Sequence, residues 1–458
     1  MLVACIAGVV LLSRFLTSEN PIIALPDNSS TPTAVATDEE GTPAARALPT
    51  EDVAEILPGD ASLPGRIVFV DEEGQLGTVG ANRDAPRFLD DEGERVYLFP
   101  AWAPNGTSIA TIGAERGGGG VYVIDDVAGA DVTELYFSQT GAPIYLYWRP
   151  DGGAVSYIAS GENSLNLYLS PQNGRGEPQL LLEGQPLYWD WLDEQSQLFV
   201  HTGTPLSDGR LTIVEASADP VLDEGPVDPG YFQAPGVSTG AANVAFAEFD
   251  GESRLLAVRN LASGDEQRTE HQGVVAMSWS PAEQILAFIS PAEADHGNDF
   301  SFYGPLRLID AETGAVSLLV DETVLAFFWS PDGQTIAYFT LARGAGEQVA
   351  DSQGQESARA QGKVRRQREG LFLNLSLISV SGGQPNSLVD FRPTELFLTQ
   401  FLPFFDQYAL SHQLWSPDSQ ALVLPIVDDD RAQIYVVPVS GSGLRPVADG
   451  AVAFWSPR

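Results

Sequence analysis

Basic residues and cysteine are the scarcest components of this 458-residue sequence, and each scarcity excludes a class of protein. Lysine and arginine together number 24 against 62 aspartates and glutamates, so the formal net charge is −38. So acidic a surface repels nucleic acid and anionic membranes, and we expect neither as a direct surface partner. The single cysteine, Cys5, excludes an intramolecular disulfide and a thiolate metal site.

Histidine is nearly as rare, which bears on metal binding. The four histidines are His201, His271, His296 and His412, and no two have the i, i+4 spacing of a helical zinc site. Two acid-rich stretches, residues 291–304 and 428–430, lack the register of an EF-hand and are interpreted as solvated loops. We therefore expect no metal and no cofactor.

Residues 1–16 form a hydrophobic segment, apolar from 2 to 12 and interrupted by Arg14. Its length fits the hydrophobic region of a signal peptide, or the end of a spanning helix that begins upstream. Residues 2–5 resemble a lipobox, so a lipoprotein is one alternative, and a buried helix is another. We expect a membrane anchor, with the rest of the protein extracytoplasmic and touching the membrane through this segment only.

Residues 17–63 change composition to proline, threonine, alanine and acidic residues with little periodicity. Such a segment cannot bury enough apolar surface to fold, and its charges repel one another. The sequence therefore predicts a disordered tether between the anchor and the folded domain.

From residue 64 onward the chain repeats one pattern, seen most clearly as WSPDGQTIAY at 329–338. If the tryptophan is position i, a proline stands at i+2 and a turn such as Asp-Gly at i+3 and i+4. An apolar–small–apolar triplet then begins at i+7. We call the first position of this pattern the frame residue. The frame residues are Trp102, Trp148, Trp191, Val237, Trp279, Trp329, Trp415 and Trp455, of which Trp191 and Val237 lack the proline.

The pattern predicts a β-hairpin, because proline ends a strand and Asp-Gly turns the chain tightly. With two further strand-like runs, each unit of about 40–50 residues has the four strands of a propeller blade. Each frame tryptophan is expected to fill the wedge between blades. Residues 451–455 supply a first strand and 66–70 a second, so the two ends should pair and close the ring. We predict an all-β propeller of eight four-stranded blades over residues 64–458, or seven if a degenerate unit is not a blade.

This repeat resembles that of the TolB-like, WD40-like propeller family, and the resemblance covers roughly residues 66–457. It implies a propeller that acts as a protein-binding scaffold or as an accessory domain of a peptidase. Two features differ from TolB itself: its preceding α/β domain has no counterpart here, and this repeat count is eight where TolB has six.

Two stretches interrupt the repeat. Residues 342–370 are a polar insertion with a basic cluster, interpreted as a solvated surface loop. Residues 395–412 are rich in aromatic side chains and are expected to pack over one face of the disc. Alternatively, Asp406, Gln407, Tyr408 and His412 line a mouth of the central channel, and these four are the only candidate binding residues.

No catalytic constellation is evident. Residues 236–240 match G-x-S-x-G, but a strand follows where a nucleophile elbow needs a helix, and the stretch occupies the turn of a blade. The inner ends of several first strands are apolar, which argues against an acidic active site in the channel (Leu98, Leu146, Ala276 and Ala326). We predict a monomeric, non-catalytic scaffold that binds a protein or an envelope component. The alternatives are a hydrolase or lyase that binds a ligand or metal at the channel mouth, and the sensor domain of a membrane signalling system.

Overall fold

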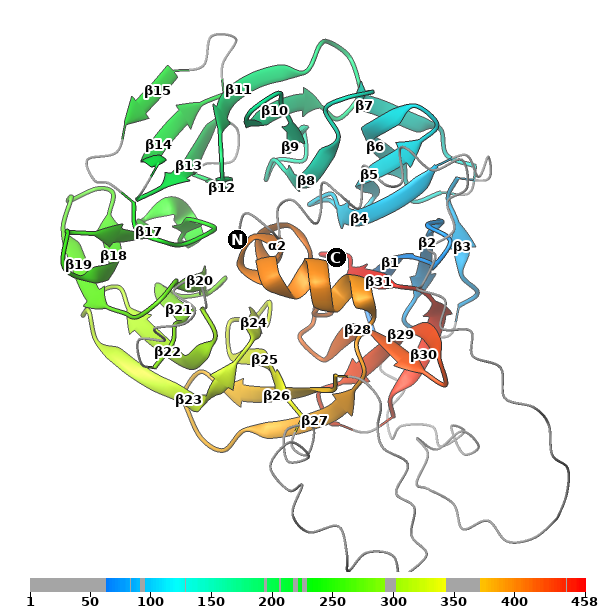
Figure 1. The fold of residues 1–458 in the computed structure, drawn as a ribbon. Helices are drawn as coiled ribbons and strands as arrows, with labels where there is room; N and C mark the ends of the chain where they lie inside the picture. The colour runs from blue at the N-terminus through cyan, green and yellow to red at the C-terminus, as the bar shows by residue number, and fades with distance from the viewer. Residues whose placement is uncertain are drawn as a thin grey trace, which may run out of the picture.

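The computed structural model describes residues 63–458 except 83, 91–94, 128, 193–195, 206, 217–220, 225–228, 293–301, 343–370 and 442. The predicted anchor at 1–16 and, but for Leu63, the tether at 17–63 lie outside the described residues. So does the insertion at 342–370, apart from Ala342, and most of the acid-rich stretch 291–304. The described residues form eight antiparallel sheets set radially around a central axis, so the chain is an eight-bladed β-propeller (Figure 1).

We number the blades by the order of their frame residues. The strands of the first four blades are, from the axis outward, β4 (Val96–Trp102), β5 (Ser108–Glu115), β6 (Gly118–Asp125) and β7 (Val132–Ser138) in blade 1; β8 (Pro143–Trp148), β9 (Ala154–Ser160), β10 (Leu165–Pro171) and β11 (Gln179–Gly184) in blade 2; β12 (Leu187–Trp191), β13 (Gln197–Thr204), β14 (Ser207–Glu215) and β15 (Val221–Glu224) in blade 3; and β16 (Gly236–Val237), β17 (Asn243–Phe249), β18 (Arg254–Asn260) and β19 (Glu266–Glu270) in blade 4.

The other four blades follow the same plan. Their strands are β20 (Ala276–Trp279), β21 (Ile285–Ile289), β22 (Gly304–Asp310) and β23 (Val316–Val324) in blade 5; β24 (Ala326–Trp329), β25 (Thr335–Leu341), β26 (Leu373–Ser379) and β27 (Asn386–Phe391) in blade 6; β28 (Ala421–Asp428), β29 (Arg431–Pro438) and β30 (Arg445–Asp449) in blade 7; and β31 (Val452–Trp455), β1 (Arg66–Val70), β2 (Leu76–Gly80) and β3 (Arg87–Phe88) in blade 8.

The strand register confirms the predicted hairpins, because in seven blades the frame residue pairs with the residue seven positions later. In the eighth blade, Trp455 pairs with Ile67 from the other end of the domain. The pairs are Trp102–Ile109, Trp148–Val155, Trp191–Leu198, Val237–Val244, Trp279–Leu286, Trp329–Ile336, Trp415–Leu422 and Trp455–Ile67. The two units without proline are therefore blades, and the count is eight rather than seven.

Blade 7 departs from the predicted four strands. Its sheet has three, and the inner position is occupied by Trp415, which forms a single bridge to Leu422. The chain reaches this position from the helix α2 (Phe405–Ser411) rather than from a neighbouring outer strand. Too few residues separate the helix from Trp415 to form a full inner strand.

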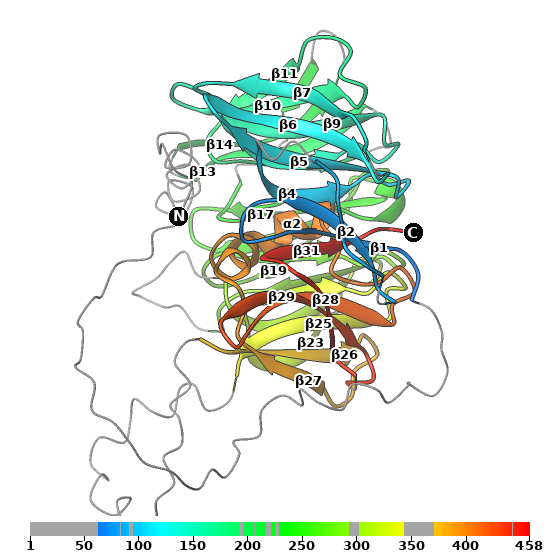
Figure 2. The same cartoon turned by 90° about the vertical axis from the view of Figure 1, so that its right-hand side faces the viewer.

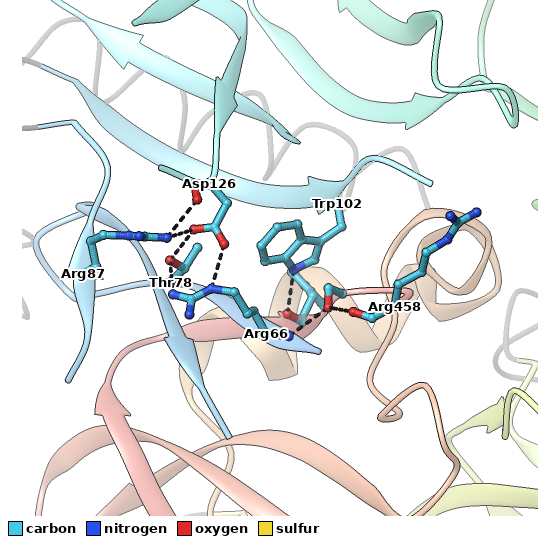
Figure 3. Close-up of polar contacts among 8 residues, drawn as sticks. Arg66, Thr78, Arg87, Trp102, Asp126 and Arg458 are labelled. Atoms are coloured by element: carbon cyan, nitrogen blue, oxygen red, sulfur yellow. Dashed lines mark hydrogen bonds and ion pairs between the residues drawn. The ribbon is translucent and has the colours of Figure 1, made fainter. Parts of the chain in front are cut away.

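The two ends of the fold close the ring as predicted, with β31 paired antiparallel to β1. Within blade 6, the Ser330 hydroxyl accepts a hydrogen bond from the Thr335 N–H at 3.0 Å, which stabilises the turn after the frame tryptophan. In blade 8 the Ser456 hydroxyl accepts the equivalent bond from the Arg66 N–H at 2.9 Å, although these two residues come from opposite ends of the folded domain (Figure 3). The hydrogen bond of the repeated turn thus joins residues 390 positions apart.

An acidic side chain of blade 1 ties it to the closing blade. Asp126 forms ion pairs with Arg66 and Arg87, and accepts a hydrogen bond from the Thr78 hydroxyl at 2.7 Å (Figure 3). Its carboxylate is 8% exposed, whereas the two arginines are each about one-third exposed. The cluster therefore joins β1, β2 and β3 to the end of β6 through one nearly buried charge.

Frame tryptophans also join neighbouring blades through their indole N–H groups. In four blades the indole donates to the carbonyl of the residue just before the preceding frame residue: Trp102 to Phe454 (3.3 Å), Trp148 to Ala101 (3.0 Å), Trp329 to Ser278 (3.0 Å) and Trp415 to Phe328 (3.1 Å). These four indoles therefore contact the neighbouring blade and fix the relative positions of the inner strands. That every frame tryptophan fills a wedge between blades stays a prediction.

The charge cluster predicts a specific loss of stability in Asp126→Ala. Removing the carboxylate leaves two arginines without their common partner, so we expect the free energy of unfolding to fall by about 1–3 kcal/mol, less than for a fully buried pair because the arginines are partly solvated. Urea denaturation measures the change. The control is Asp430→Ala, since Asp430 pairs with Arg392 but its side chain is 92% exposed. Equal effects of the two substitutions would contradict the role given to Asp126.

Candidate functional site

The centre of the ring is closed by the aromatic segment that interrupts the repeat. It consists of the π-helical turn η3 (Phe397–Phe401), the 3-10 turn η4 (Leu402–Phe404) and α2. We call residues 397–412 the plug, because α2 lies at the centre of the disc in both views and contacts β8, β12, β20 and β24 (Figures 1 and 2).

Aromatic side chains hold one side of the plug against blade 6. Phe401 stacks on Phe328 with ring centroids 5.7 Å apart, and Phe405 lies edge-on to Phe327 at 5.1 Å. These rings are fully or almost fully buried. Burial of large aromatic surfaces gives the plug most of its binding energy to the ring and leaves it few alternative positions.

Hydrogen bonds hold the plug to the other side of the ring. The Asp406 carboxylate accepts the Ala234 N–H at 3.3 Å, and the Gln233 side chain donates to the Pro403 carbonyl at 3.3 Å. His412 Nε2 is 3.1 Å from the Phe99 carbonyl, and burial lowers the histidine pKa to about 4. The imidazole is therefore neutral near pH 7, with Nε2–H donating to the carbonyl.

The structure brings the four predicted binding residues together on the plug, but buries them. Asp406, Gln407, Tyr408 and His412 are between 1% and 5% exposed. Tyr408 packs against Phe99, with ring centroids 4.9 Å apart and ring planes tilted by 32°. Only Asp406 and His412 border a cavity, and a binding role for the four remains a prediction.

Two adjoining cavities of about 420 and 550 Å³ lie at one mouth of the channel, above the end of α2. Because both cavities are bordered by the same residues of blades 2 and 5 and by Ala409 and Leu410 of the plug, we treat them as one and call it the mouth cavity. A ring of prolines from the repeated turns surrounds the first part: Pro104, Pro150, Pro281, Pro331 and Pro457. This rim is apolar and rigid.

The second part of the mouth cavity lies where the repeat is degenerate. Blades 3 and 4 lack the proline, and blade 4 has Val237 in place of a tryptophan. The smaller side chain leaves space that an indole occupies elsewhere. This part is bordered by Asp190 of β12 and Asp406 of the plug, together with Trp191, Trp279 and Tyr147.

Asp190 was not among the predicted site residues. Its carboxylate accepts hydrogen bonds from the N–H groups of Val237 (2.9 Å) and Trp191 (2.8 Å), so it links blades 3 and 4 where no indole does. A signal was present in the sequence, because among the residues that precede the frame residues only Asp190 is acidic.

Burial controls the titration of both carboxyl groups. Desolvation raises the pKa of Asp190 to about 7, despite the opposing hydrogen bonds from Val237 and Trp191. Desolvation likewise raises the pKa of Asp406 to about 7 against the bond from Ala234. No lysine or arginine forms an ion pair with either carboxylate in the described part of the chain. The mouth cavity thus contains two groups that change charge near neutral pH.

Two indoles bordering this part of the cavity lack the inter-blade bond of the repeat. The N–H groups of Trp191 and Trp279 are buried and have no acceptor among the described residues. By analogy with the other blades, the acceptor for the Trp191 indole would be the Tyr147 carbonyl. That carbonyl instead accepts a hydrogen bond from the Ser156 hydroxyl at 2.8 Å. Trp279 packs on Gly236 so closely that a Cβ there would lie 2.9 Å from the indole nitrogen. Buried donors of this kind are uncommon in folded proteins.

The G-x-S-x-G stretch has a structural role. The Ser238 hydroxyl is buried and accepts the Asn243 N–H at 2.9 Å, as Ser330 accepts the Thr335 N–H in blade 6. A strand, β17, follows the turn, as the sequence predicts.

Neither a metal cluster nor a membrane-spanning helix is present among the residues that the structure describes. No three His, Cys, Asp or Glu side chains gather there in positions that suit a metal ion. The helices in the same ranges are too short or too polar to cross a bilayer.

Comparisons with known proteins identify the fold alone. No family model matches the sequence, and no curated protein matches it. Among solved structures, the dihydro-heme d1 dehydrogenase NirN in complex with DHE is 12% identical with a TM-score of 0.52, covering 86% of this chain and 76% of that one.

Two other structures are less similar. An oligogalacturonate lyase in complex with manganese is 13% identical (TM-score 0.44, covering 84% of this chain and 86% of that one). TolB from Acinetobacter baumannii is 16% identical (TM-score 0.35, 71% and 64%). Both similarities are at low identity, and the activity named for the lyase is not transferred to this chain.

The raised pKa of Asp406 predicts a pH-dependent effect of Asp406→Asn. Because the folded-state pKa lies above that of an exposed aspartate, folding favours the protonated acid, and this stability is lost as the pH rises through about 7. Relative to the unmodified protein, the variant should gain a few kcal/mol in unfolding free energy between pH 5.5 and 8.5. Urea denaturation across this range tests it, with the exposed Asp430→Asn as control. A difference that does not change with pH would contradict the prediction.

Proposed function

We propose that this chain is a non-catalytic, extracytoplasmic interaction module of the TolB-like propeller type, which binds a partner protein at the mouth cavity. The observation that supports this most is the mouth cavity itself. A rigid proline rim surrounds an apolar floor, and buried polar groups lie on one side, as in many recognition sites. The floor residues Ala409 and Leu410 are half-buried and so remain accessible.

The arrangement of the whole protein follows from this proposal. A membrane anchor at residues 1–16 and a tether at 17–63 would hold a monomeric disc away from the envelope surface. The high negative charge keeps such a disc soluble and discourages non-specific contact with anionic surfaces. A binding site at the axis is then accessible to a partner whichever way the disc turns on its tether.

A second candidate is an enzyme of the hydrolase or lyase type. The specific observation in its favour is that Asp190 and Asp406 border one cavity and both have a pKa near 7, which suits general acid–base chemistry near neutral pH. Each carboxylate, however, accepts backbone N–H groups that hold blade 4 or the plug in place. Acceptance of these bonds requires no proton transfer by either residue, and we favour the binding function.

Site-specific photo-cross-linking tests the binding function. The full chain carries a photoreactive phenylalanine analogue at Leu410, on the floor of the mouth cavity, and is irradiated in the cells that produce it. We expect one predominant cross-linked polypeptide, because a partner seated on the rim lies within reach of this side chain. Mass spectrometry of the adduct identifies it.

The matched control carries the same analogue at Leu318, on the outer strand β23, where the side chain is 55% exposed. A more exposed probe should capture more of any non-specific neighbour. Cross-linking from position 318 but not from 410, or identical adducts from both, would contradict binding at the mouth.

A further inference from the structure

The degenerate side of the mouth cavity has a charge pattern that indicates what it binds. Asp190 and Asp406 are 5% and 1% exposed, come from different parts of the ring, and both border the same cavity. Each carboxylate oxygen has room for two hydrogen bonds. Backbone N–H groups and, for Asp190, the Tyr147 hydroxyl at 3.4 Å use only part of that capacity. A buried carboxylate is normally paired with a cation.

The described residues do not supply that cation. No lysine, arginine or charged histidine is among the residues that border the mouth cavity. The surface of the protein is strongly acidic, which raises the local concentration of cationic groups and repels anionic ones. The missing charge is therefore one that a ligand brings.

The walls of the cavity indicate which kind of chemical group would connect the positive charge to the rest of the ligand. Between the rim and the two carboxylates lie Pro150, Pro281, Leu410 and the rings of Trp191 and Trp279. Such walls suit a chain of methylene groups, and the face of an indole attracts an ammonium or guanidinium group. A long, flexible basic side chain fits both requirements.

The proposed function supplies the carrier of that charge. A partner protein seated on the rim brings lysine and arginine side chains, which combine an apolar stem with a cationic end. The indole nitrogens of Trp191 and Trp279 are buried, so these two residues border the cavity with the carbon atoms of their rings.

We propose that the mouth cavity receives a lysine or arginine side chain of a partner polypeptide, with Asp190 and Asp406 as its counter-charges and the rings of Trp191 and Trp279 beside its stem. This inference rests on the proposed function, since it names the chemistry recognised at the same site. The acidic carboxylates act here as ligands for a charge and not as catalytic groups.

Calorimetric titration of the full chain with blocked pentapeptides tests the inference at pH 8, where both carboxyl groups are mainly ionised. The central residue of an otherwise all-alanine peptide is arginine, lysine, citrulline or norleucine. We expect the arginine and lysine peptides to bind at least tenfold more tightly than their neutral counterparts. This comparison uses the unmodified protein, so it does not depend on any variant folding.

Substitutions then locate the site. Asp406→Asn and Asp190→Asn should each weaken binding of the arginine peptide at least tenfold and leave the weak binding of the norleucine peptide unchanged. Asp430→Asn, on the exposed hairpin of blade 7, should change neither. Thermal melting verifies that each variant is folded.

Three outcomes would overturn the inference. Citrulline and norleucine peptides that bind as tightly as the charged ones would remove the role of the cation. In a parallel titration, agmatine that binds as tightly as the arginine peptide would show that the site recognises a free amine and not a polypeptide. Failure of all four peptides to bind would remove the ligand class. In each case a partner cross-linked from Leu410 would leave the proposed binding function standing, whereas absence of that adduct would remove the function as well.

Discussion

The pairing of β31 with β1 is the constraint on which the rest of the structure depends. It places Trp455 opposite Ile67 in the register that all other blades have within a single hairpin, and it lets Ser456 accept the N–H of Arg66 as an ordinary turn would. Closure gives β1 a partner on the edge that faces the axis, so that blade 8 has four strands. It also fixes the diameter of the channel, and only a channel of fixed diameter can be filled by a segment as well packed as the plug.

Part of the mouth cavity lies beside blades 3 and 4, whose sequences depart from the repeat. In four blades an indole N–H joins neighbouring inner strands, and proline-containing turns narrow the mouth. At blade 4 the frame residue is Val237, and the link to blade 3 is made instead by the carboxylate of Asp190. Val237 is smaller than the tryptophan of the other blades, and the ionisable side chain of Asp190 lies beside it. The most irregular part of the ring is thus also the part of the mouth cavity that contains both carboxyl groups.

Much of the fold could be predicted from sequence because the information is local and repeated. The spacing from Trp329 to Ile336 defines one hairpin. Seven copies of that spacing, and an eighth frame residue at Trp455, define the blade count and the closing strand. Blade 7 could not be predicted in the same way, because the loss of its inner strand follows from the position of α2. That position depends on rings such as Phe401 and Phe405 meeting blade 6, which are long-range contacts that no spacing encodes.

The site was predicted in part for the same reason. The aromatic stretch around Asp406 is anomalous within the repeat, so its residues could be singled out, but their burial depends on the ring around them. Asp190 becomes distinctive only when the residues before the frame positions are compared across blades. That it borders the same cavity as Asp406 follows from the placement of blades 3 and 4 beside the plug, and this is a property of the closed ring.

The most direct measurement of the central claim is carboxyl-carbon NMR titration of the aspartates, with Asp190→Asn and Asp406→Asn used to assign the two signals. We expect two aspartates to titrate near pH 7 in the free protein, because burial without a cation raises the pKa of both. Addition of the arginine peptide should lower both pKa values, since a bound cation favours the ionised form. Two ordinary aspartate pKa values near 4, or values near 7 that the peptide leaves unchanged, would contradict a mouth cavity built to receive a positive charge.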